Sequence, residues 1–100
     1  MSIRIAVVDD HSVVRQGMRS FLSDIGMDVV GEATNGDEAI QLAETHQPDV
    51  MLLDIRMKDS DGLSALPKIK AASPNTQVII LTTYANPAYL SQAMRDGASG

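Results

Sequence analysis

The sequence predicts a doubly wound α/β fold, in which helices cover both faces of a parallel sheet. Two observations lead to this prediction. Short apolar runs alternate along the chain with longer segments in which apolar residues recur every three or four positions. The runs are nearly continuous instead of alternating with polar residues, as is typical of strands buried on both faces. Regular alternation of such strands with helices favours a parallel sheet.

Four segments have the composition of strands. Each is rich in Val, Ile or Leu and lies beside a turn or a polar cluster. They are IRIAVV at 3–8, MDVVGEA at 27–33, VMLLD at 50–54 and QVIIL at 77–81. We expect all four in one sheet.

The remaining segments predict four helices. In the first, apolar residues recur at helical spacing up to Ile25, and Gly26 follows as a stop signal. The second ends before Pro48, which blocks its continuation, and the third contains Pro67, either in its first turn or at a kink. The last three helical segments are GDEAIQLAETHQ, GLSALPKIKAA and PAYLSQAMRDGA.

Composition limits the size and the class of the protein. One hundred residues form one domain at most. Thirteen acidic and eight basic residues give a net charge of −5 without a basic run, which argues against direct nucleic-acid binding. The absence of cysteine excludes disulfides and thiolate metal ligands. No segment resembles a signal peptide or a membrane span, so we expect a cytoplasmic protein without a membrane partner.

Polar residues follow three of the predicted strands. Asp9 and Asp10 come after the first strand, Asp54 ends the third, and Thr82 and Thr83 follow the fourth. The carboxyl ends of parallel strands form one ligand-binding edge, so we expect these side chains to be neighbours. Clustered carboxylates repel one another unless a cation lies between them, and such oxygen ligands suit Mg²⁺. The sequence therefore predicts a Mg²⁺ site at which Asp54 can accept a phosphoryl group.

Several of the polar residues also have simpler interpretations. A lone Asp after a strand is more often a helix N-cap than a ligand, so Asp10 is also a candidate cap. Asp59 and Asp61, beside Gly62, are predicted to be turn and cap residues. His11 is interpreted as a solvated side chain and not as a catalytic base. The convergence of acids from separate strands is what favours a functional site.

Five motifs follow one another along residues 3–100, namely VVDDH, DVMLLDIRM, SDGL, VIILTTY and AMRDGASG. Their order and separations resemble the receiver domain of bacterial response regulators. DDHSVVRQGMRSFL and VVGEATNGDEAI are most similar to the NarL/FixJ-type subfamily, whose members carry a LuxR-like output domain. The resemblance implies the flavodoxin-like strand order 2-1-3-4-5.

The resemblance assigns a role to each residue of the predicted metal and phosphoryl site. Asp54 is similar to the phosphorylated residue of the family and is also a metal ligand. Asp9 and Asp10 are similar to the acidic pair that holds Mg²⁺. Arg56 matches the residue whose backbone carbonyl binds the ion, and its side chain lies where family members tune the lifetime of the phosphoryl group.

Residues after the fourth strand match the family's switch region. Thr82 is similar to the switch hydroxyl that binds the phosphoryl group, and Thr83 to the small residue beside it. Tyr84 falls at the second position that tunes phosphoryl lifetime. Lys58 is a departure, because family members usually have Pro after the Met of this loop, and the change makes the loop less rigid.

The resemblance also predicts what the chain lacks. In the family, an aromatic switch residue, a fifth strand ending in a phosphate-binding Lys and a fifth helix follow the segment that matches GASG. None of these is present in residues 1–100, so we expect a receiver domain truncated at its C-terminus. The DNA-binding output domain is absent as well. The fourth strand would then be an unpaired edge that favours pairing with another chain.

The expected function is a phosphorylation-dependent switch of a two-component system. A sensor histidine kinase or a small phosphodonor would phosphorylate Asp54 in the presence of Mg²⁺. By resemblance, the switch controls homodimerisation and, through the absent output domain, DNA binding and transcription. The chain is then no enzyme beyond accepting and losing its own phosphoryl group.

Two alternatives to this function were considered. Aspartate-nucleophile phosphohydrolases of the haloacid-dehalogenase type also place an Asp after a strand, but they need a second Asp two residues later. This chain has Arg56 there, which argues against such an enzyme. The other alternative is a receiver-like module that binds proteins without phosphorylation. Asp9, Asp10 and Asp54 argue against it for the parent protein, but the missing Lys keeps it open for residues 1–100.

Overall fold

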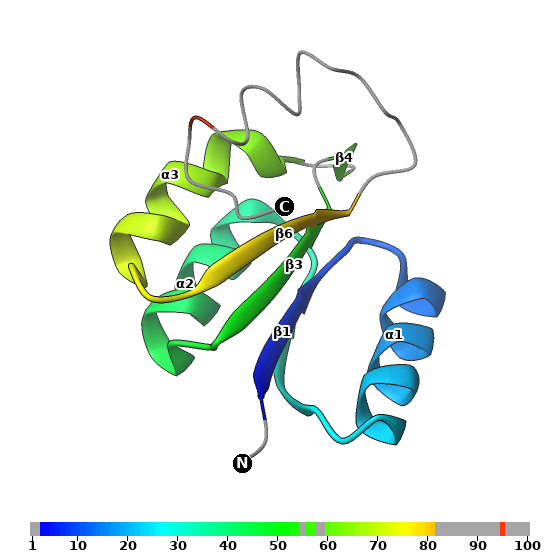
Figure 1. Ribbon diagram of the computed structural model, residues 1–100. Coiled ribbons are helices and arrows are strands. Elements are labelled where there is room, and N and C mark those ends of the chain that lie inside the picture. The colour runs from blue at the N-terminus through cyan, green and yellow to red at the C-terminus, as the bar shows by residue number, and fades with distance from the viewer. Residues whose placement is uncertain (1–2, 55, 58–59, 82–94, 96–100) are drawn as a thin grey trace.

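The structure is a computed structural model that describes residues 3–54, 56–57, 60–81 and 95. Strands and helices alternate along the chain, as predicted (Figure 1). The elements are β1 (Arg4–Val8), α1 (Ser12–Asp24), β2 (Asp28–Ala33), α2 (Gly36–His46), β3 (Val50–Asp54), β4 (Arg56–Met57), β5 (Ser60–Asp61), α3 (Gly62–Ala72) and β6 (Gln77–Leu81).

The four predicted strands form one parallel sheet in the order β2-β1-β3-β6. Counted along the chain, this is the order 2-1-3-4 of a flavodoxin-like sheet, so the predicted fold class is confirmed. In the central pair, Val8 of β1 lies opposite Leu53 of β3. Because the pairing is parallel, the residues that follow Val8 and Leu53 leave the sheet at the same level.

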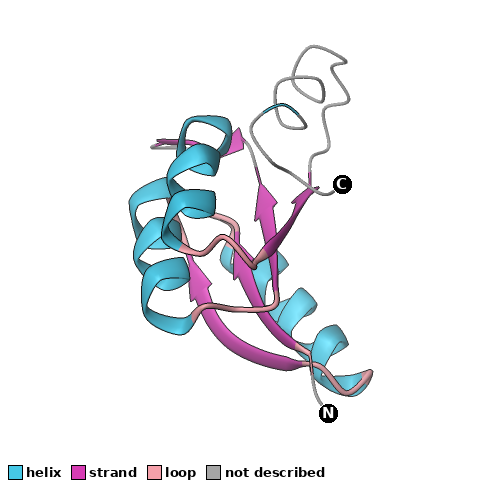
Figure 2. Cartoon of the chain, turned by 60° about the vertical axis from the view of Figure 1, so that its left-hand side comes forward, coloured by secondary structure: helices cyan, strands magenta, loops and turns pink. Residues whose placement is uncertain are grey.

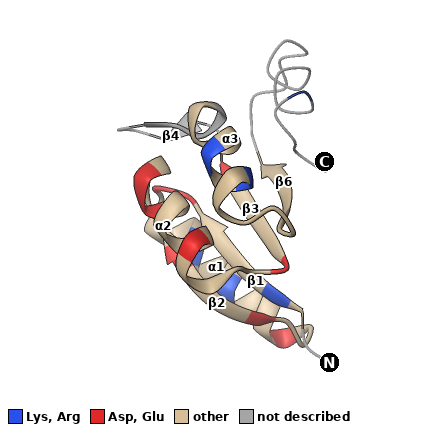
Figure 3. Cartoon of the chain, turned by 90° about the vertical axis from the view of Figure 1, so that its left-hand side faces the viewer, with Lys and Arg blue, Asp and Glu red and all other residues tan. Residues whose placement is uncertain are grey.

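Helices cover both faces of the sheet. α1 lies against one face, and α2 and α3 lie side by side on the other (Figures 1 and 2). The strands carry few charged residues (Figure 3), and alternate side chains enter the two cores. In β1, for example, Ala6 and Val8 face α2 and α3, whereas Ile5 and Val7 face α1. Strands buried on both faces explain the continuous apolar runs of the sequence.

α2 begins with a capping arrangement close to the end of β2. Asn35 is the N-cap, and its side-chain oxygen accepts a hydrogen bond of 2.8 Å from the Glu38 amide. The Glu38 carboxylate in turn accepts bonds from the hydroxyl and the amide of Thr34, at 2.6 and 2.8 Å. These bonds from Thr34 lower the pKa of Glu38. The reciprocal bonds fix the direction in which the chain leaves β2.

Polar contacts join the ends of α2 and α3 where strands β3 and β6 begin. Gln47 ends α2 with a φ of 46°, in the left-handed region. Its side-chain amide donates to the Ala72 carbonyl at 2.8 Å, and its side-chain oxygen accepts from the Ser73 hydroxyl at 3.0 Å. The Thr76 hydroxyl donates to the Pro48 carbonyl at 2.6 Å. We call Gln47, Ala72, Ser73, Thr76 and Pro48 the basal network.

Two local features differ from the expectations, and two predicted features lie wholly or mostly outside the described residues. Arg56 pairs with Asp61 in a short antiparallel ribbon of β4 and β5 that was not predicted, so Asp61 is a strand residue directly before α3. Pro67 lies in the second turn of α3 and is exposed. Asp59 and most of the predicted helix at 87–98 lie outside the described residues. Among the residues that are described, no helix is both long and apolar enough to cross a membrane.

Candidate functional site

Four side chains that could bind a cation meet at the carboxyl ends of β1 and β3. Asp9, Asp10 and His11 follow β1, and Asp54 ends β3. One potential ligand atom from each lies within 4.8 Å of all the others. The register of Val8 opposite Leu53 brings the two segments together. The structure thus gathers the three acids that the topology predicted to be neighbours, while their individual roles stay predictions.

Asp9 is held in place through both its backbone and its side chain. It is 6% exposed, and its amide donates to the Ala33 carbonyl of β2 at 3.0 Å. Its carboxylate accepts a hydrogen bond of 2.8 Å from the amide of His11. The N-cap of α1 is His11, whose side chain makes no capping bond, so the alternative role of Asp10 as a helix cap is wrong. The Asp10 side chain is instead part of the acidic cluster.

His11 contacts two of the acids although its side chain is 66% exposed. Its Nδ1 atom lies 2.9 Å from Asp9 Oδ1 and 3.0 Å from Asp10 Oδ1. The hydrogen bond to Asp9 raises the pKa of His11 above 6.5, and the charges of Asp10 and Asp9 add to the shift. The interpretation of His11 as a merely solvated side chain was therefore incomplete. Its position directly after two Asp residues was the available signal.

The titration of His11 should report on the acidic cluster. We expect a folded-state pKa above 6.5, because both neighbouring carboxylates favour the imidazolium ion. The stabilisation from charged His11 is then complete below pH 6.5 and is lost as the pH rises through the folded-state pKa. NMR spectra of the ring recorded against pH measure the midpoint, and Asp10→Asn should lower it. A midpoint at or below 6.5 in the unmodified protein would contradict the expectation.

The other predicted site residues are described only in part or not at all. Arg56 opens β4, two positions after Asp54, and its backbone pairs with that of Asp61. Thr82, Thr83 and Tyr84 lie outside the described residues. Their switch and tuning roles, and the carbonyl of Arg56 as a metal ligand, therefore remain predictions.

The donor set of this site fits Mg²⁺. Asp9, Asp10 and Asp54 supply carboxylate oxygens from two strands, and oxygen atoms are the ligands that this hard ion prefers. Mg²⁺ needs only one or two carboxylates beside water and phosphate oxygens, so the cluster is sufficient. A cation at this position would neutralise part of the negative charge around Asp54. The arrangement therefore has the components needed for phosphoryl transfer to a carboxylate.

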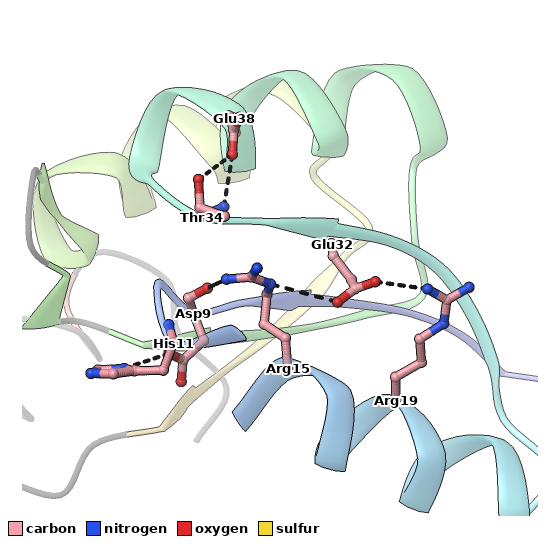
Figure 4. Close-up of polar contacts among 7 residues, drawn as sticks. All are labelled: Asp9, His11, Arg15, Arg19, Glu32, Thr34 and Glu38. Carbon is pink, nitrogen blue, oxygen red and sulfur yellow. Dashed lines mark hydrogen bonds and ion pairs between the residues drawn. The ribbon is translucent and has the colours of Figure 1, made fainter. Parts of the chain in front are cut away.

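An arginine of α1 lies behind the acids and was not identified from the sequence. Arg15 Nη1 donates a hydrogen bond of 2.7 Å to the backbone carbonyl of Asp9. Its Nε atom lies 3.6 Å from Glu32 Oε1, and Arg19 Nη1 donates to Glu32 Oε2 at 2.9 Å (Figure 4). Helical periodicity leaves Arg15 outside the apolar stripe of α1 but carries no information about its partner.

Comparisons with known proteins agree with the fold. The family model described as the response regulator receiver domain matches residues 5–100. The oxygen regulatory protein NreC of Staphylococcus carnosus is 41% identical over 100 residues, covering 98% of this chain and 46% of NreC. The chain thus spans about half the length of the curated relatives it matches.

Solved structures of LuxR-family regulators have the same fold. A two-component response regulator from Aurantimonas sp. SI85-9A1 superposes with a TM-score of 0.92 at 32% identity, over 100% of this chain and 72% of that one. A DNA-binding response regulator from Staphylococcus aureus superposes with a TM-score of 0.86 at 30% identity, over 96% of this chain and 81% of that one. The chain therefore belongs to the response regulator receiver domain family, and within it to the NarL/LuxR-type regulators.

Proposed function

We propose that this chain is the phosphorylation-dependent switch of a two-component system. Asp54 accepts the phosphoryl group, and Asp9, Asp10, Asp54 and the backbone carbonyl of Arg56 bind Mg²⁺. The observation that carries the proposal is the convergence of three carboxylates from β1 and β3 within 4.8 Å in a chain of the receiver family. The presence of an Asp at the tip of a central strand, next to the acidic pair, supports Asp54 as the acceptor.

The chemistry follows from the arrangement of the acids. A carboxylate oxygen of Asp54 forms a bond to the phosphorus of the donor as the bond between phosphorus and the leaving group breaks. The leaving group takes the electron pair, and Asp54 becomes an acyl phosphate. Bound Mg²⁺ would offset the charge of the transferring group. Asp9 and Asp10 hold the ion at the edge of the sheet, and His11 lies on the outer side of the two carboxylates.

The acyl phosphate is the signal. Phosphorylation adds about 1.5 to 2 negative charges, which draw the hydroxyl of Thr82 toward Asp54, with Thr83 beside it. Arg56 and Tyr84 tune the lifetime of the modification. We infer that a sensor histidine kinase is the donor in the cytoplasm and that a second copy of the chain is the partner of the phosphorylated form. DNA binding belongs to an output domain outside residues 1–100.

Phosphorylation by acetyl phosphate tests the proposed function. Intact-mass spectrometry of the full-length protein should detect one added phosphoryl group when Mg²⁺ is present and none when EDTA replaces it. A fragment of residues 1–100 should be labelled weakly or not stably. The modification should be sensitive to hydroxylamine, as an acyl phosphate is. A protein that binds its partners but never gains this mass would be the protein-interaction module considered above, and the phosphorylation proposal would be wrong.

A further inference from the structure

We propose that Arg15 is a positioning residue of the acidic site, held in place by Glu32. Arg15 would set the direction in which Asp10 leaves β1, and thereby the affinity of the site for a divalent cation. The inference rests on the proposed cation site, but it assigns a role to side chains that contact neither the ion nor the phosphoryl group. It links the edge strand β2 to the chemistry at the ends of β1 and β3.

The contacts of Arg15 reach two elements at once. Its Nη1 atom binds the carbonyl of Asp9 at 2.7 Å, and its Nε atom faces Glu32 Oε1 at 3.6 Å. The side chain is only 18% exposed, which limits its exchange with water. A guanidinium ion has donors on a rigid fork, so one side chain can bind both partners in a fixed geometry. Figure 4 shows Arg15 between Asp9 and Glu32.

The carbonyl of Asp9 is the group through which Arg15 acts. This carbonyl shares a planar peptide with the amide of Asp10, so its orientation restricts ψ of Asp9 and φ of Asp10. The preceding amide, that of Asp9, is bound to the Ala33 carbonyl of β2. With Arg15 in place, both the amide and the carbonyl of Asp9 are therefore hydrogen-bonded. Without Arg15, the peptide between the two acids loses one of its restraints, while the bond from the His11 amide to the Asp9 carboxylate still spans it, and the direction of the Asp10 carboxylate is less well fixed.

Glu32 belongs to β2, where it lies opposite Val7 in the parallel register. Its side chain is 27% exposed and accepts a hydrogen bond of 2.9 Å from Arg19 as well as the ion pair with Arg15. Arg19 is 61% exposed, and its Nη1 atom donates to Glu32 Oε2. Arg19 therefore offers a matched control. It has the same charge as Arg15 and binds the same Glu32 carboxylate, but the bond to the Asp9 carbonyl belongs to Arg15.

The sign of the effect separates positioning from simple electrostatics. Removing a positive charge near three carboxylates strengthens the binding of Mg²⁺ if charge alone matters. Loss of a residue that orients the ligands weakens binding, typically 10- to 100-fold for residues that support metal ligands. Arg15→Gln is therefore expected to raise the Kd for Mg²⁺ about tenfold, against the electrostatic trend.

The experiment is a titration with MgCl₂ alone, monitored through the amide resonances of the protein without a phosphodonor. Variants Arg15→Gln, Arg15→Lys, Glu32→Gln and Arg19→Gln are compared with the unmodified protein. We expect the Kd for Mg²⁺ to increase strongly in Arg15→Gln and to a smaller extent in Arg15→Lys and Glu32→Gln. In Arg19→Gln the Kd should change by no more than about twofold, as for other exposed charges. Glu32→Gln should add nothing in the Arg15→Gln background, because the two side chains act in series.

The outcomes distinguish this inference from the proposed function. An unchanged or lower Kd in Arg15→Gln overturns the positioning role, even if the unmodified protein is phosphorylated on Asp54. A higher Kd in Arg15→Gln supports it, even if acetyl phosphate never labels the protein. Equal increases in Arg15→Gln and Arg19→Gln indicate an effect that does not depend on the bond to the Asp9 carbonyl, and they also overturn it. If Arg15→Gln unfolds, Arg15→Lys, which keeps the positive charge, provides the same comparison at smaller amplitude.

Discussion

Replacement of Asp54 with Asn is expected to abolish phosphorylation by acetyl phosphate. The amide that replaces the carboxylate lacks the negative oxygen that attacks phosphorus, so no acyl phosphate can form. The change also removes a charged ligand from a cluster whose ligand atoms lie within 4.8 Å of one another. Intact-mass spectrometry under the conditions that label the unmodified protein measures the loss.

A suitable control for this substitution is Asp37→Asn. Asp37 is an exposed acid in the first turn of α2 and is not a member of the acidic cluster, so full labelling is expected. A thermal midpoint in Mg²⁺-free buffer at or above that of the unmodified protein, as expected when one of three neighbouring carboxylates is removed, would exclude unfolding as the cause. Labelling of Asp54→Asn to the level of the Asp37→Asn control would show that another residue is the acceptor.

The second large effect concerns stability. Leu53→Ala is expected to lower the free energy of unfolding by about 2 to 5 kcal/mol. Leu53 is 0% exposed in β3, between Val8 of β1 and Ile80 of β6. The close packing of both neighbouring strands prevents collapse around the missing atoms, so a cavity remains. Urea unfolding followed by circular dichroism measures the change.

Val13→Ala is the comparison for this core substitution. Val13 is 79% exposed on α1, so its truncation should change the free energy of unfolding by no more than about 0.5 kcal/mol. A loss below about 1 kcal/mol in Leu53→Ala, beneath the usual range for such changes, would show that the core relaxes around the cavity. Leu53 and Asp54 are adjacent, yet one substitution should act on stability and the other on chemistry.

The strands could be predicted closely from their apolar composition. The predicted ranges 50–54 and 77–81 coincide with β3 and β6, and the first two strands begin one residue later than predicted. In the central strands β1 and β3, most side chains are buried, which explains their continuous apolar runs. The edge strands β2 and β6 are buried only in part. The ribbon of β4 and β5 was missed because two-residue strands are too short to have a hydrophobic period.

The site could be predicted as far as the topology determines it. Asp9, Asp10 and Asp54 are neighbours because β1 and β3 are parallel and central, which the pattern of elements already implied. The contacts of His11 and Arg15 depend on how side chains cross from a loop and a helix to nearby groups. Such contacts leave no periodic signal in one sequence, so they emerged only from the structure.

The basal network of hydrogen bonds lies at one end of the sheet, and the acidic cluster lies at the other. Gln47, Ser73 and Thr76 connect the ends of α2 and α3 with the starts of β3 and β6, opposite the acids. The Thr76 hydroxyl bond is buried and the Ser73 bond is buried in part. Local opening is least favourable where hydrogen bonds are buried. We therefore expect the chain to open less readily at the basal network than at an exposed loop, which hydrogen exchange of the backbone amides measures.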